Sequence, residues 1–154
     1  MIFRNPPDAP DSGTGSPGYR HRPAASRVSC TPHGNESGGP KLANALVTEV
    51  TQTDDGFTVT TEDGATHTAK YVVLAEGKGV KLNQSLGLSK EGRSVEVDRN
   101  GRTAVSGLYT VGRSTKMNRS QAIISAGEGA SAALDILSTE AGKDVLDYDS
   151  PPKE

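Results

Sequence analysis

The 154-residue sequence has no tryptophan, one cysteine and no apolar run near the roughly 20 residues of a membrane-spanning helix. One cysteine excludes both an internal disulfide and a dithiol redox pair within the chain. Because aromatic residues are few, a core must be built mainly from Val, Leu, Ile and Ala. The formal net charge of −2 gives no electrostatic argument for nucleic-acid binding. We therefore expect neither a nucleic-acid partner nor a membrane partner.

The first 40 residues also lack the apolar stretch of a secretory signal, so a cytoplasmic location is the default expectation. They hold seven of the nine prolines, many glycines and serines, and almost no large aliphatic residues. Such a segment buries too little apolar surface to offset the entropy lost on ordering. We therefore predict that residues 1–40 are disordered or unrelated to the folded part.

Two patterns in this segment look like ligand sites. Cys30 lies near His21 and His33, but one thiol and two imidazoles in a disordered tail make a poor site, so no metal is expected. Residues 13–18 match G-x-G-x-x-G. However, no buried strand precedes them, and Pro17 has no amide to offer a pyrophosphate. We interpret this match as accidental.

From residue 41 onward the pattern is that of a folded chain. Residues 41–53, 57–61 and 65–69 alternate polar and apolar side chains, which predicts three strands. Asp-Gly turn sequences at 54–56 and 62–64 separate them, so the three segments predict a β-meander.

Residues 71–75 (YVVLA) are continuously apolar, which is typical of a strand buried on both faces of a parallel sheet. The following segment is more irregular. Up to residue 103 the pattern predicts only short elements: one helical turn near 82–86, a short strand at 95–97 and a turn at 98–101.

Residues 103–137 are the most informative. An apolar strand at 108–111 breaks at Gly112, and a long helix starts near Ser120 after a polar loop. A strand ending in glycine before a helix N-terminus is how α/β proteins prepare a site for a phosphate or an electron-rich ring. Spacings of three and four predict the helix face that packs on the sheet, made by Ala122, Ile123, Ala126, Ala130, Ala133, Leu134 and Leu137.

The helix also contains two glycines, Gly127 and Gly129, each of which costs about 1 kcal/mol relative to alanine. They lie inside the helix rather than between a strand and a helix, so they do not form a phosphate loop. We expect them to allow close packing against a strand.

Three features follow one another along the chain: the meander, then YVVLAEG, then GLYTVGRS followed by NRSQAIISAGEGASAALDIL. Together they resemble the C-terminal part of the FAD-binding domain of thioredoxin-reductase-like pyridine nucleotide–disulfide oxidoreductases. The resemblance covers about residues 44–148. It implies an α/β class: a partial FAD/NAD(P)-binding, Rossmann-like, two-dinucleotide-binding-domain fold with a β-meander, a buried strand and a long C-terminal helix. The implied division is residues 1–40 as a disordered or unrelated segment, 41–148 as the partial oxidoreductase domain and 149–154 as a tail.

The resemblance implies FAD as cofactor and NAD(P)H as a second ligand. It implies these cofactor-binding residues: Ala75, Gly77, Gly112, Arg113, Gln121 and Ala122. The first two belong to an Ala-x-Gly turn in which Glu76 replaces the usual threonine. Gly112 would approach the ribityl–phosphate region, and the helix start at Gln121 would lie beside the pyrimidine side of the flavin. Unpaired amides and roughly half a positive charge at a helix N-terminus suit a reduced flavin there.

Arg113 stands where the family has aspartate. Arginine has only donors, so Arg113 either pairs with the pyrophosphate or is a solvated loop charge. The resemblance also implies a G-x-G-x-x-G on a first strand, a second such site for NAD(P)H and, in many members, a Cys-x-x-Cys. None of these three features is present in the sequence, and no catalytic residue is identified. We expect a truncated chain, and a misplaced start, a frameshift or a degenerate gene would each produce one. Three interpretations stay open: a fragment or divergent member of a FAD-dependent NAD(P)H oxidoreductase, a non-catalytic β-rich interaction module that could form a homo-oligomer, or a degenerate pseudoenzyme.

Overall fold

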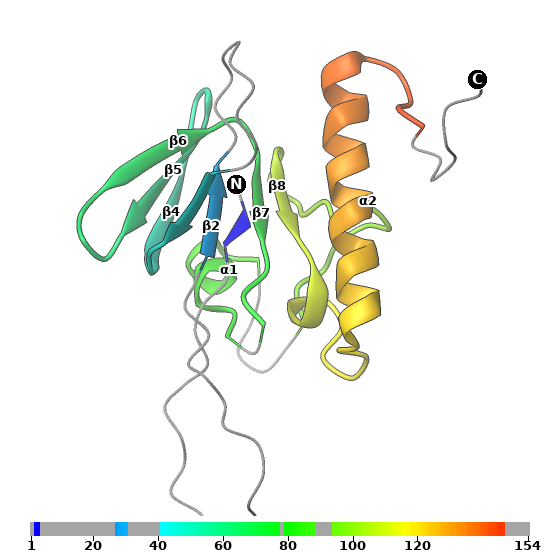
Figure 1. The fold of residues 1–154 in the computed structure, drawn as a ribbon, viewed down its shortest axis with the longest axis horizontal. Coiled ribbons are helices and arrows are strands. Elements are labelled where there is room, and N and C mark those ends of the chain that lie inside the picture. Colours follow the sequence, from blue (N-terminus) through cyan, green and yellow to red (C-terminus); the bar gives the residue numbers. More distant parts are fainter. Residues whose placement is uncertain (1, 4–26, 31–40, 78, 89–93, 147–154) are drawn as a thin grey trace, which may run out of the picture.

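The computed structural model describes residues 2–3, 27–30, 41–77, 79–88 and 94–146. These residues form two β-sheets and a long helix (Figure 1). The strands are β1 (Ile2–Phe3), β2 (Arg27–Cys30), β3 (Lys41–Asn44), β4 (Val47–Thr53), β5 (Gly56–Thr61), β6 (Thr66–Ala69), β7 (Val72–Leu74) and β8 (Leu108–Thr110). The helices are α1 (Lys81–Ser85), the 3-10 turn η1 (Gly112–Ser114) and α2 (Ala122–Ala141).

The predicted β-meander is confirmed as the antiparallel sheet β4-β5-β6. Its first turn requires glycine, because a Cβ on Gly56 would collide with the carbonyl oxygen of Ala69. The single strand predicted over 41–53 is instead two strands, β3 and β4, which belong to different sheets. The chain changes sheets at Leu46, whose carbonyl accepts a hydrogen bond from the Glu62 amide (2.8 Å).

The second sheet has the order β3-β2-β1-β7-β8. Strand β7 pairs in parallel with both β1 and β8, as predicted for the YVVLA run. It is also buried on both faces: Val72 and Leu74 join one apolar cluster, and Val73 joins the other.

Strands β1 and β2 lie within residues 1–40, for which the division into a disordered or unrelated segment stays a prediction. Each obtains its hydrogen bonds from neighbours on both sides, β1 from β2 and β7, and β2 from β1 and β3. Composition averaged over 40 residues does not register two such short strands. The rest of that segment, including the G-x-G-x-x-G match at 13–18, His21 and His33, lies outside the described residues, as does the tail at 149–154.

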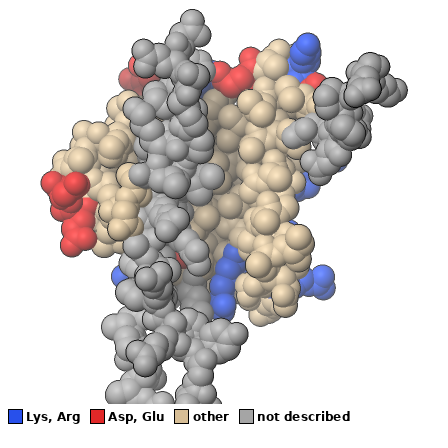
Figure 2. Space-filling view, in the orientation of Figure 1, with Lys and Arg blue, Asp and Glu red and all other residues tan. Residues whose placement is uncertain are grey.

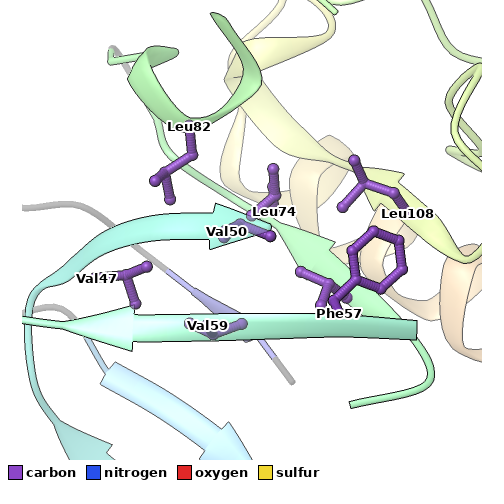
Figure 3. Close-up of a cluster of buried hydrophobic side chains, with 8 residues drawn as sticks. Val47, Val50, Phe57, Val59, Leu74, Leu82 and Leu108 are labelled. Atoms are coloured by element: carbon purple, nitrogen blue, oxygen red, sulfur yellow. The ribbon is translucent and has the colours of Figure 1, made fainter. Parts of the chain in front are cut away.

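The strands β7 and β8 are the middle layer of three (Figure 1). The meander covers one face, where the first apolar cluster lies (Figure 3), made by Val47, Val50, Phe57, Val59, Val72, Leu74, Leu82 and Leu108. Helix α2 covers the other face, where the second cluster lies, made by Val73, Tyr109, Val111 and Ala132 with Ile136 packed against them.

The segment between β7 and β8 agrees with two of three predictions. Helix α1 is the expected helical turn, and the turn at 98–101 is closed by the Gly101 amide donating to the Asp98 carbonyl (3.2 Å). The strand predicted at 95–97 is wrong, because this segment pairs with no strand. Its buried Val95 donates its amide to the carbonyl of Ser114 in η1 (2.9 Å).

Candidate functional site

Shortly after strand β8 the chain turns at a glycine that the local geometry requires, as the sequence predicts. Gly112 has a φ of +77°, a conformation that costs other residues about 1–2 kcal/mol. A Cβ at this position would lie 3.4 Å from Oγ and 3.5 Å from Cβ of Ser125, one turn into α2. Gly112 therefore turns the chain out of the sheet directly against the beginning of α2.

The glycine-containing ends of β7 and β8 lie at the same edge of the sheet. The two strands are parallel, with Leu74 opposite Thr110, and the Val111 amide donates to the Leu74 carbonyl (2.9 Å). Ala75 and Gly77 thus follow β7 at the edge where Gly112 follows β8. Gly77 has a φ of +72°, and none of the residues that the structure describes lies within 4 Å of the place where its Cβ would be. This edge therefore offers bare backbone to a ligand. Arg113 is half-buried in η1 beside it.

The N-terminus of α2 is open as well. Gln121 is the N-cap, in extended conformation, and its side chain makes no capping hydrogen bond. The first turn contains no acidic residue, and the earliest amide bonded within the helix is that of Ser125, to the Gln121 carbonyl (3.1 Å). Gln121 and Ala122 are exposed. The helix therefore presents unpaired amides and a partial positive charge at this point.

Glu128, which sequence reasoning missed as a site residue, joins the helix to the turn. Its Oε2 accepts the Gly112 amide (2.6 Å) and lies 3.2 Å from Oγ1 of Thr115, while its Oε1 pairs with Nζ of Lys116. Burial raises the pKa of Glu128, but donation by Lys116 and Gly112 outweighs it, so the pKa is lowered. The signal available in the sequence was an acidic residue inside the small-residue run of a helix that packs on a sheet.

Glu76 is a buried carboxylate at the end of β7. Its Oε1 accepts the Leu82 amide (2.9 Å), and its Oε2 accepts the amide (3.1 Å) and Nδ2 (2.5 Å) of Asn83. Burial raises the pKa of Glu76, against the lowering effect of these donors. Asn83 Oδ1 accepts in turn from Oγ1 of Thr110 (2.7 Å). Glu76 therefore fixes the start of α1 to the ends of β7 and β8.

The prediction of which face of α2 packs on the sheet is wrong. Of its seven residues only Leu134 is half-buried, while Ile123 is 80% and Leu137 53% exposed. The surface over the middle of α2 is largely uncharged (Figure 2). The face that meets the sheet is more polar, and its residues are Ser125, Glu128, Ala132, Asp135 and Ile136.

The hydrogen bonds of Asp135 explain this orientation. Its carboxylate accepts from the Tyr109 hydroxyl (2.7 Å), from Nδ2 of Asn100 (2.8 Å), and from Nε (2.5 Å) and Nη2 (2.9 Å) of Arg102. Arg102 is the main cause of the lowered pKa of Asp135. The pKa of Tyr109 is raised to about 12, mainly by burial and secondly by the hydrogen bond to Asp135. These directional hydrogen bonds from the sheet side thus determine which face of α2 packs on the sheet.

The expectation of close packing at Gly127 and Gly129 is also wrong. Among the described residues, nothing lies within 4 Å of a Cβ added at either glycine. The close approach occurs one turn later, where a Cβ on Gly101 would lie 3.9 Å from that of Ala132.

Two negative findings apply to the residues that the structure describes. They include no group of three His, Cys, Asp or Glu side chains that could hold a metal ion. None of their helices is long and apolar enough to cross a membrane.

Several solved structures match this chain. A thioredoxin reductase from Gloeobacter violaceus superposes with a TM-score of 0.56 at 13% identity, covering 82% of this chain and 84% of that chain. An atypical thioredoxin reductase from Desulfovibrio vulgaris Hildenborough gives a TM-score of 0.36 at 22% identity, covering 68% of this chain and 36% of its own. LpdA from Mycobacterium tuberculosis gives 0.34 at 26% identity, covering 68% and 23%. This chain therefore spans only a minor part of the latter two proteins.

A search of curated proteins finds no match. The fold is of the Rossmann-like, thioredoxin reductase type. The family model described as pyridine nucleotide-disulphide oxidoreductase matches residues 38–130. Members of that family are flavoproteins that usually bind FAD. Since the match extends over more than half of the sequence, the chain belongs to the pyridine nucleotide-disulphide oxidoreductase family.

Proposed function

We propose that this chain is part of a FAD-dependent oxidoreductase that uses NAD(P)H, and that the flavin is held at the junction of β8 and α2. The observation that carries the proposal is the convergence at one place of the Gly112 turn and the open N-terminus of α2. The match of residues 38–130 to a flavoprotein family supports it. In this proposal residues 41–148 are the oxidoreductase part and residues 149–154 a tail.

The residues at the junction suit different parts of such a cofactor. The open amides at Ala122 favour the electron-rich edge of a flavin ring, an effect of about 0.3–1 kcal/mol for a helix terminus. Gly77, together with the small side chain of Ala75, leaves backbone that a cofactor can approach closely, and Gly112 turns the chain toward the start of α2. Arg113 would hold a diphosphate by charge-assisted hydrogen bonds. A bound flavin supplies the electron transfer, and the chain binds and orients it.

A second candidate is a non-catalytic interaction module. The observation that favours it is the outer face of α2, where Ile123 and Leu137 are exposed. An apolar helix face of this kind suits a partner protein or a second copy of the chain.

The experiment that separates the candidates is a titration of the purified chain with FAD, followed by flavin fluorescence. If the chain binds flavin, Arg113→Ala should weaken binding about tenfold, equivalent to about 1.4 kcal/mol. Arg119→Ala is the matched control, because Arg119 is an exposed arginine of the same loop and should not change the affinity.

Two results would contradict the proposal. Equal affinity in wild type and Arg113→Ala would remove Arg113 from the site. A folded, oligomeric wild-type chain that binds no FAD would favour the interaction module.

A further inference from the structure

Three hydrogen-bond donors of one short turn converge on a single carboxylate. The Gly112 amide lies 2.6 Å and the Thr115 hydroxyl oxygen 3.2 Å from Oε2 of Glu128, and the Lys116 ammonium pairs with Oε1. The Lys116 side chain is 52% exposed, whereas that of Glu128 is 15% exposed. An anion from solution can therefore reach the Lys116 ammonium, the outermost of the three donors.

These donors are the kinds that bind phosphoryl oxygens. A backbone amide in a turn with positive φ, a hydroxyl and an ammonium group make strong, charge-assisted bonds to an oxyanion. The Thr115 hydroxyl also lies 2.8 Å from the Gly112 carbonyl oxygen and has one proton, so it can donate to either acceptor. The Thr115 hydroxyl can thus keep an acceptor when the Glu128 carboxylate leaves.

Helix α2 does not depend on Glu128 alone for its position. Asp135 bonds to Tyr109 and Arg102, and Glu140 accepts from Lys70 (2.6 Å) and from the Tyr71 hydroxyl (2.7 Å). The Glu128 carboxylate can therefore be displaced while the helix stays attached to the sheet.

We propose that Gly112, Thr115 and Lys116 form an oxyanion cradle for a phosphoryl group, and that the Glu128 carboxylate is its internal occupant, which an incoming phosphoryl group displaces. The phosphoryl group is either inorganic phosphate or the diphosphate of FAD; the second source rests on the proposed function. A carboxylate tethered to the cradle is present at high effective concentration, so it weakens binding of any external anion. Removing Glu128 should consequently strengthen that binding.

The test is a titration of the whole chain with inorganic phosphate at constant ionic strength, followed by calorimetry and by the amide resonance of Gly112. Glu128→Ala should bind phosphate at least about tenfold more tightly than wild type. Glu140→Ala is the matched control, because it removes another ion-paired carboxylate of α2 away from the cradle, and it should leave phosphate affinity unchanged. Adding Lys116→Ala to Glu128→Ala should abolish the gain.

A folded Glu128→Ala protein with wild-type phosphate affinity overturns the proposal. If that variant does not fold, Glu128→Gln replaces it, since glutamine still offers an oxygen to the Gly112 amide but no longer attracts Lys116 as an ion. This variant should gain phosphate affinity several-fold, and no gain overturns the proposal as well.

Repeating the titrations with FAD distinguishes the two sources. If Glu128→Ala binds both phosphate and FAD more tightly than wild type does, the FAD diphosphate is a ligand of the cradle. If Glu128→Ala binds phosphate more tightly than wild type does, and neither protein binds FAD, the cradle is supported and the proposed function is contradicted. FAD binding by wild type with no phosphate gain in Glu128→Ala overturns the cradle alone.

Discussion

The two faces of the central strands are covered by different means. On the meander side the contact is apolar and nearly free of solvent, with Phe57 2%, Val59 0% and Leu108 1% exposed. On the helix side the buried residue of α2 is a small one, Ala132, and the helix is held by its carboxylates. One cover of the sheet is attached mainly by the hydrophobic effect, the other largely by hydrogen bonds and ion pairs.

This difference decides what a sequence pattern can reveal. Apolar burial is non-directional, so the alternation of side chains along β5 is enough to identify the face that turns inward. Hydrogen bonds are directional, and the partners of Asp135 lie in other segments, at Asn100, Arg102 and Tyr109. The apolar periodicity of α2 consequently points to the wrong face.

The largest effect on the free energy of unfolding is expected on the meander side. Phe57→Ala should lower the free energy of unfolding by about 3–5 kcal/mol, because it removes a large buried side chain from the cluster of Figure 3 and leaves a cavity. Urea unfolding followed by circular dichroism measures the change. A loss below about 1 kcal/mol would mean that the meander is not held by this cluster.

The parts of the fold that can be predicted from the sequence are those with local causes. The meander, the doubly buried β7 and the break at Gly112 depend on alternation, a continuous apolar run and a backbone requirement, all of which are local. Strands β1 and β2 are too short to produce such a pattern, and their hydrogen bonds come from distant strands.

The candidate site divides in the same way. Gly112 and the helix start at Gln121 are predictable, because a strand, a glycine and a helix follow one another in the sequence. The contact of Glu128 with Gly112 was not predicted, since it depends on how α2 rotates about its axis. That rotation is set by bonds outside the helix.

A smaller effect is expected on the helix side. Asp135→Ala should lower the free energy of unfolding by about 1–3 kcal/mol, mainly because the part-buried Tyr109 hydroxyl loses its acceptor. The half-exposed Arg102 adds little, as solvent screens its ion pair. Asp144→Ala is the control, because Asp144 is exposed, and it should stay within about 0.5 kcal/mol of wild type. A loss as large as that of Phe57→Ala would remove the distinction between the two faces.

Two carboxyl groups, Asp135 on the helix side and Glu76 at the end of β7, should respond to pH with opposite signs. The lowered pKa of Asp135 means that its contribution is present above the pKa of the unfolded chain and is lost as pH falls through the folded value. The raised pKa of Glu76 means that the folded state binds its proton more tightly, so the contribution of Glu76 grows as pH falls through the folded value.

Unfolding free energies measured from neutral to acidic pH test these signs. Asp135→Asn should flatten the loss of stability at acidic pH, and Glu76→Gln should remove a gain that begins at less acidic pH. Both differences should be smaller than the effect of Asp135→Ala. Parallel pH curves for wild type and both variants would contradict the assignment of these carboxyl groups.

The smallest change in the free energy of unfolding is expected for the apolar face of α2, which the sequence alone predicts to be buried. Ile123→Ser and Leu137→Gln each replace an exposed apolar side chain of α2 by a polar one of similar helix propensity. Each should change the free energy of unfolding by no more than about 0.5 kcal/mol at low protein concentration. A loss above about 1 kcal/mol that grows with protein concentration would mean that a second copy covers this face. In that case the apolar periodicity of α2 would have marked an interface between chains, and the interaction module would become the better account of the helix.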